Sequence, residues 1–159
     1  MVNKEFGTKK YQTFIQSLLV ENIEDFTKKL SDYLIFTISF HNLGEKDKEK
    51  SYHLFLLGLV ACLKDTHIIL SNRESGHGRY DIKIIPKSKS KHAAFILEFK
   101  RSETSNNLEK LANDALNQIK QKLYSTEINE FSHIESVVKI GLAFCGKEVK
   151  LAYEKLKIK

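Results

Sequence analysis

Residues 79–85, Arg79-Tyr80-Asp81-Ile82-Lys83-Ile84-Ile85, and residues 93–100, Ala93-Ala94-Phe95-Ile96-Leu97-Glu98-Phe99-Lys100, have the pattern of two strands joined by a basic turn. An aspartate interrupts the apolar pattern of the first stretch, and an acid and a lysine end the second. Side chains two positions apart on a strand leave the same face, so Glu98 and Lys100 point together and Phe99 points the opposite way. The pattern predicts a hairpin that gathers two carboxylates and one ammonium group.

This charge set is suited to phosphodiester chemistry. Carboxylate oxygens, with the carbonyl oxygen of Phe99 between them, are the ligands that Mg²⁺ prefers. A neighbouring lysine can orient a water molecule or neutralise charge that develops on a phosphate. The alternative is that acids and lysines at strand ends are merely solvated, and Glu-x-Lys occurs by chance in basic proteins. Their position next to apolar runs favours partnered groups, because burying an unpaired charge is costly.

Composition places the chain among globular proteins of one domain. It has 159 residues, of which 42% are hydrophobic and 29% are charged. The formal charge of +6 favours polyanionic partners such as nucleic acid, although lysine also serves solubility. The two cysteines lie far apart without a zinc-ligand pattern. No secretory signal and no apolar run of membrane-spanning length is evident, so we expect a cytoplasmic protein without a membrane partner.

The first forty residues predict two short amphipathic helices. The segment 35–40 has strand-forming residues but can also extend the second helix. A polar stretch at 41–50 is expected to be a connection. We therefore expect an N-terminal helical appendage at residues 1–46 and a main domain at residues 47–159.

The main domain is expected to have an α/β fold. A buried helix at 49–64 should precede a hairpin at 67–85, a strand at 93–100 and an amphipathic helix at 107–124. Two strands are expected at 137–144 and 148–158, the latter at a sheet edge. Because the helix at 107–124 links two strands, we expect a parallel crossover and a central mixed β-sheet flanked by helices.

Three motifs resemble those of the PD-(D/E)XK nuclease superfamily, which has a restriction-endonuclease-like core. They are Gly78-Arg79-Tyr80-Asp81, Glu98-Phe99-Lys100 and Ala115-Leu116-Asn117-Gln118-Ile119. The resemblance extends over Tyr11 to Ile158 and is closest to the branch usually attached to the C-terminus of an AAA-ATPase-like domain. It departs from the family pattern at Tyr80, which stands where the family name has proline. The ATPase-like domain is not in this sequence, so the resemblance implies a stand-alone or truncated nuclease module, with such a partner in another chain.

By this resemblance Asp81 and Glu98 hold Mg²⁺, or alternatively Mn²⁺, and the carbonyl group of Phe99 between them can add an oxygen ligand. Lys100 is the catalytic lysine, Gln118 matches the glutamine beside the site, and Glu49 matches an acid contributed by the first helix of the core. The implied activity is Mg²⁺-dependent hydrolysis of a nucleic acid, with DNA as the expected substrate. A rival interpretation is a non-catalytic nucleic-acid or protein interaction module that retains the fold.

Several candidates also have purely structural interpretations. Glu49 can act as a favourable acid at a helix start. His53 lies on the same helix face. A histidine in such a position is more often a hydrogen-bonded core residue than a general base. Gln118 can be a solvated helix residue. The lysines of the turn at 87–91 can contact phosphates or can simply be solvated.

Overall fold

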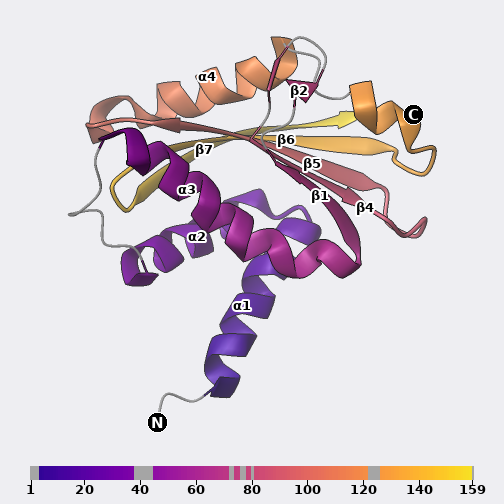
Figure 1. Ribbon diagram of the computed structural model, residues 1–159, viewed down its shortest axis with the longest axis horizontal. Helices are drawn as coiled ribbons and strands as arrows, with labels where there is room; N and C mark the ends of the chain where they lie inside the picture. The colour runs from indigo at the N-terminus through magenta and orange to yellow at the C-terminus, as the bar shows by residue number, and fades with distance from the viewer. Residues whose placement is uncertain are drawn as a thin grey trace.

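A mixed β-sheet with helices on both faces organises the molecule (Figure 1). The computed structural model describes residues 4–37, 45–71, 74–75, 78–79, 81–121 and 126–158. The five strands of the sheet, in their order across it, are β1 (His67–Ser71), β4 (Ile82–Pro86), β5 (Ala93–Arg101), β6 (Ser136–Cys145) and β7 (Glu148–Lys157). Two further strands, β2 (Glu74–Ser75) and β3 (Gly78–Arg79), pair with each other. The arrangement confirms the expected α/β fold, a restriction-endonuclease-like core with a central mixed sheet.

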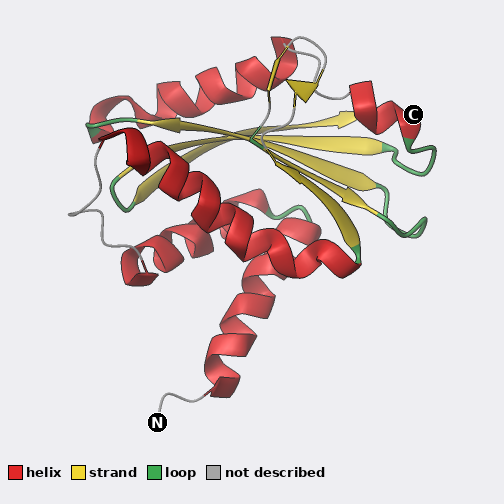
Figure 2. Ribbon diagram, viewed as in Figure 1, coloured by secondary structure: helices red, strands yellow, loops and turns green. Residues whose placement is uncertain are grey.

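Helices are distributed unequally over the two faces (Figure 2). One face carries α1 (Lys4–Leu19), α2 (Ile23–Thr37) and α3 (Glu45–Val60), and the other carries α4 (Leu108–Gln121). Three 3₁₀ turns complete the described structure: Ala61–Asp65 after α3, Ser105–Asn107 before α4 and Thr126–Glu130 after it. Among the helices of the described segments, none has the length and apolar character needed to cross a bilayer.

Strand directions follow from the lengths of the connections. β1 pairs with β4, β4 with β5 and β6 with β7, all antiparallel. The pairing of β5 with β6 is parallel, with Glu98 opposite Gly141, because the intervening chain crosses the sheet as α4. The predicted hairpin at 67–85, the crossover and the terminal edge strand are confirmed.

Alternation along the strands separates two buried layers. Ile82, Phe95, Leu97 and Phe99 face α1–α3, in one cluster that also contains Phe14 and other side chains of the first two helices. The opposite face carries a second cluster, which packs against α4 and the segment after it. The members of that cluster are Ile85, Ala94, Ile96, Ile119, Ile128, Ile134 and Val137. Residues 93–99 therefore divide between the two faces as their spacing predicts.

Some predicted boundaries are wrong. Helix α3 begins at Glu45, inside the stretch expected to be a connection, and ends at Val60 rather than at residue 64. Its first turns contain acids and lysines at spacings that also suit a helix. The polar character of this stretch was therefore not enough to identify it as a loop. Strand β4 begins at Ile82, because Gly78–Arg79 pairs with Glu74–Ser75 instead. Residues 41–44 and 122–124 lie outside the described residues. The boundary at residue 46 stays a prediction.

Candidate active site

The two central strands separate next to Asp81. The last register pair of β4 and β5 joins Ile82 to Leu97, and Asp81 lies in a bend just before β4. The main-chain amide of Phe99 would face a neighbouring strand if β4 continued. Instead it donates a hydrogen bond of 2.7 Å to Oδ2 of Asp81. The carboxylate therefore substitutes for a strand carbonyl and fixes Asp81 beside the second acidic motif.

A second contact network links Glu98, Lys100 and Gln118. Glu98 is only 5% exposed, and the Nε2 amide group of Gln118 donates a hydrogen bond to its Oε1. Lys100 Nζ donates to Oε1 of the same glutamine, at 2.6 Å. The amide thus joins a carboxylate to an ammonium group and holds each at a defined place. The solvated interpretation of Gln118 does not describe this geometry.

His53 on α3 approaches the same region from the other face of the sheet. Its Nε2 lies 2.7 Å from Oγ of Ser71, its Nδ1 lies 4.0 Å from Oδ1 of Asp81, and its ring meets Phe99 edge to face. Burial lowers the pKa of His53 below its usual 6.5, which favours the neutral ring with one nitrogen lone pair. The sequence indicated His53 mainly as a core histidine. Its spacing of four residues from Glu49 was the one signal for a functional position.

The donor chemistry of these residues fits a hard divalent cation. Asp81 and Glu98 supply carboxylates, and the carbonyl of Phe99 leaves the strand on the same side as its N–H, toward Asp81. Mg²⁺ commonly takes one or two protein carboxylates and keeps several waters. Within the described residues, no group of three His, Cys, Asp or Glu side chains is arranged to hold a metal. Helix α3 contains Glu49, whose side chain lies outside the described part.

Comparison with known families identifies this arrangement. A family model described as the PD-(D/E)XK nuclease superfamily matches residues 47–154, which run from α3 into β7. The chain belongs to this superfamily. The match includes every residue of the network above, and the helices α1 and α2 precede it.

Other comparisons add little to the PD-(D/E)XK assignment. None of the curated proteins matches this chain. A solved structure described as "Crystal structure of SSO0001" is similar at 15% sequence identity, with a TM-score of 0.35. The similarity covers 70% of this chain and 51% of that one, so the chain spans about half the length of that protein. A TM-score of this size carries no argument about function.

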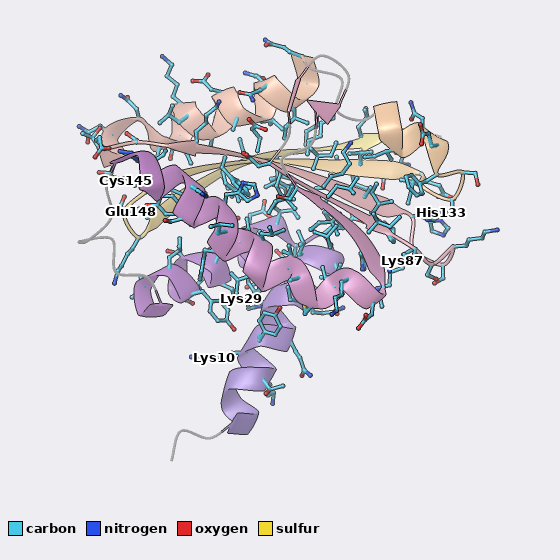
Figure 3. The ribbon with its side chains drawn as sticks, in the orientation of Figure 1. Lys10, Lys29, Lys87, His133, Cys145 and Glu148 are labelled. Carbon is cyan, nitrogen blue, oxygen red and sulfur yellow. The ribbon has the colours of Figure 1, made fainter. Side chains whose placement is uncertain are left out.

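The basic turn lies away from the PD-(D/E)XK residues. Asp81 and Lys87 flank β4 at its two ends, and the intervening chain at about 3.3 Å per residue separates them by roughly 20 Å. Figure 3 shows Lys87 and His133 at one end of the sheet, and Cys145 and Glu148 toward the other. A surface pocket of about 480 Å³ also lies on the Lys87 side, lined partly by Lys91, His92 and Ser136. The structure therefore brings neither the turn nor this pocket to the candidate site.

Proposed function

We propose that the chain is a metal-dependent nuclease that hydrolyses phosphodiester bonds of DNA. The observation that carries the proposal is the shared network in which Gln118 joins Glu98 to Lys100 while Asp81 is held on the amide of Phe99. Membership of the PD-(D/E)XK nuclease superfamily supports the reaction class. The formal charge of +6 supports a polyanionic substrate.

In this proposal Asp81, Glu98 and the carbonyl of Phe99 hold Mg²⁺ or Mn²⁺, with Glu49 as a further ligand. Such an ion acidifies a bound water and stabilises charge on the phosphate. Asp81 is kept in place by the Phe99 amide, and the neutral ring of His53 lies beside its second oxygen. Lys100 is the positive group for the reacting phosphate, and Gln118 orients its ammonium. A partner chain with an AAA-ATPase-like domain and a cytoplasmic location belong to the same proposal.

The first prediction concerns cleavage. Asp81→Asn and Lys100→Ala should each lower the rate of DNA cleavage with Mg²⁺ by about 100-fold or more, because the first weakens the proposed metal site and the second removes a positive charge beside the reacting phosphate. A panel of single- and double-stranded DNA and RNA substrates measures the rates and identifies the preferred nucleic acid. Lys87→Ala is the matched control, since it removes a lysine at the far end of β4.

Two results would count against the proposal. Wild-type rates in both variants would show that the cleavage does not use these residues. Salt-sensitive binding of DNA that needs no metal and leads to no cleavage would favour the rival function, a binding module that retains the fold.

A further inference from the structure

A charged pocket lies at the end of the sheet opposite the candidate active site. Its volume of about 480 Å³ is within the range of about 300–1,000 Å³ that is usual for small-molecule sites. In Figure 3 this end of the sheet is marked by Lys87 and His133. The proposed nuclease reaction makes no use of the pocket, so it is a candidate for a separate binding site.

The strand register explains why the sheet is hollow at this place. Ala93 of β5 lies opposite Ser136 of β6, which in turn lies opposite Lys157 of β7. Ala93 packs against the cluster under α1–α3, so this row of residues faces the first helices. The two central residues of the row have small side chains, which leave space above the strands. Leu19 and Phe95, which belong to the same cluster, close the pocket toward the core.

Two polar side chains of the pocket are almost completely buried. His67 is 2% exposed and Ser136 is 7% exposed. Nδ1 of His67 lies 2.8 Å from Oγ1 of Thr66. Among the residues that the structure describes, neither Nε2 of His67 nor Oγ of Ser136 has a hydrogen-bond partner. Because buried polar groups are normally hydrogen-bonded, these two atoms mark a place for a polar ligand.

The acids that line the pocket have basic partners of their own. Oε2 of Glu21 lies 2.5 Å from Nζ of Lys155, and Oε1 of Glu135 lies 3.6 Å from Nδ1 of His92. These contacts hold both carboxylates at the walls. The remaining charges of the pocket therefore decide which ligand it favours.

Those remaining charges are positive. Lys91 and Lys157 line the pocket and form no ion pair with any residue of the described segments. Burial lowers the pKa of His67 below 6.5, and the charges of Lys91 and Lys87 lower it further. The same field that disfavours a protonated ring favours an anion beside it.

We propose that this pocket binds a phosphate monoester of nucleotide size. Such a group has nearly two negative charges at neutral pH and three free oxygens, which suit Lys91, Lys157 and the hydroxyl of Ser136. Nε2 of His67 adds a donor when this nitrogen carries the proton. Leu19, beside the small floor of the pocket, offers apolar surface to the organic part of the ligand.

The depth of the polar atoms favours a terminal phosphate over one inside a nucleic-acid strand. A phosphodiester continues into chain on both sides, whereas a monoester can enter a pocket with its free oxygens first. A free nucleotide and the phosphorylated end of a strand both present this group. Because the pocket lies far from Asp81 and Glu98, its ligand does not depend on the proposed nuclease function.

Calorimetry with adenosine monophosphate (AMP) tests the proposal in EDTA. The wild type should bind AMP with a dissociation constant of about 1 mM or lower, and adenosine at least roughly tenfold more weakly. Lys157→Met, at an exposed strand end, should weaken AMP binding about tenfold, because it removes a charge-assisted hydrogen bond. Lys87→Met loses the same charge outside the pocket lining and should match the wild type. Equal affinities for AMP and adenosine, or equal affinities of the two variants for AMP, would overturn the proposal.

Histidine ring signals in nuclear magnetic resonance spectra locate the bound AMP. The signals of His67 in the pocket should shift on titration, and those of His53 beside Asp81 should not. A shift confined to His53 would place AMP at the candidate active site and would overturn the proposal.

An oligonucleotide with and without a terminal phosphate distinguishes the two sources of the ligand. Tighter binding of the phosphorylated strand, lost in Lys157→Met, would identify a strand end. Binding of AMP without such a difference would identify a free nucleotide. Either result supports the pocket as a phosphate monoester site, and binding of neither AMP nor the phosphorylated strand would overturn it.

Discussion

Asp81 and Gln118 show how single side chains can complete a site that the backbone leaves open. Where β4 leaves β5, the Phe99 amide needs an acceptor, and the aspartate supplies it. Where α4 passes above β5, a glutamine amide satisfies a carboxylate and a lysine at once. A charged residue held by such contacts loses little freedom when a ligand arrives, which favours a preorganised site.

A buried histidine far from the site gives the second prediction. His67 is 2% exposed, and its pKa is lowered from 6.5 by burial and by the charges of Lys91 and Lys87. The folded state therefore binds the proton less readily than the unfolded state does. The contribution of His67 to stability is present above pH 6.5 and is lost as the pH falls below that value through the lowered pKa.

Replacing His67 by glutamine should reduce the loss of unfolding free energy between pH 6.5 and pH 5. This holds whether or not the variant is less stable than the wild type at pH 8. The measurement is the free energy of unfolding in urea at several values between pH 8 and pH 5, for the wild type and His67→Gln. Parallel pH dependences in the two proteins would contradict the assignment.

The sequence was enough to name most residues of the candidate site, but not to predict which of them are in contact. Asp81, Glu98, Lys100 and Gln118 were named from motif and strand spacing, and the structure brings the last three into one hydrogen-bonded network. The proximity of His53 to Asp81 depends on how α3 crosses the sheet, which no local pattern encodes. Their roles in catalysis and metal binding stay predictions.

At the scale of elements, the close packing of α4 against β6 controls the position of Gln118. A Cβ atom added to Gly141 would lie 2.2 Å from the carbonyl oxygen of Ala112 and 2.6 Å from the amide nitrogen of Leu116. Both are backbone atoms of α4, so no side-chain rotation can relieve the clash. The absence of a side chain at Gly141 is what allows this helix to lie close enough for its glutamine to reach Glu98.

The third prediction follows from this contact. Gly141→Ala should lower the free energy of unfolding by about 1–3 kcal/mol, because the helix must shift away from the strand. It should also reduce cleavage, since Gln118 moves with the helix. Gly58→Ala is the matched control, because a Cβ atom there meets nothing within 4 Å. In the last turn of α3 it should raise stability by at most about 1 kcal/mol. Equal stability of the two variants would show that α4 is not held this closely.

Helices and strands could be told apart from the sequence because burying one face gives the apolar residues of each element a regular spacing. The apolar stripe of α4 and the alternation of Phe95, Leu97 and Phe99 both follow the predicted faces. The start of α3 was not predictable, because its first residues, Glu45-Lys46-Asp47-Lys48-Glu49, are all charged, as the residues of a loop often are. The short β2–β3 pair was also missed, since two residues are too few to show any period.

At the scale of the whole molecule, α1 and α2 share the core of the sheet. Phe14 and Phe26 stack with ring centroids 4.9 Å apart and belong to the cluster that contains Phe95, Phe99 and Phe144. Polar contacts add to this packing. Lys155 lies 2.5 Å from Glu21, Tyr153 donates to Glu24 at 2.8 Å, and Lys147 donates to the carbonyl of Ile35. These helices therefore cover apolar surface that the strands would otherwise expose.

The fourth prediction is that the first two helices are required for stability. Phe26→Ala should lower the free energy of unfolding by about 3–5 kcal/mol, because Phe26 is completely buried. A fragment of residues 47–159 should melt well below the full chain, as followed by circular dichroism. Ile35→Ala, at a half-exposed position of the same helix, should change stability by less than about 1 kcal/mol. A fragment as stable as the full chain would show that the sheet does not depend on α1 and α2.

The parallel pairing of β5 with β6 also determines when, during synthesis, the candidate site can be assembled. Residues 67–101 can form the hairpin strands and carry Asp81 and Glu98 as soon as they leave the ribosome. Helix α4 packs on β6 as well as on β5, so it cannot take its final position until Ser136–Cys145 has been made and has closed the long connection back to β5. A growing chain therefore carries both carboxylates well before it can place the glutamine that joins them to the lysine. On the proposed function, a growing chain could not cleave nucleic acid before β6 has been made.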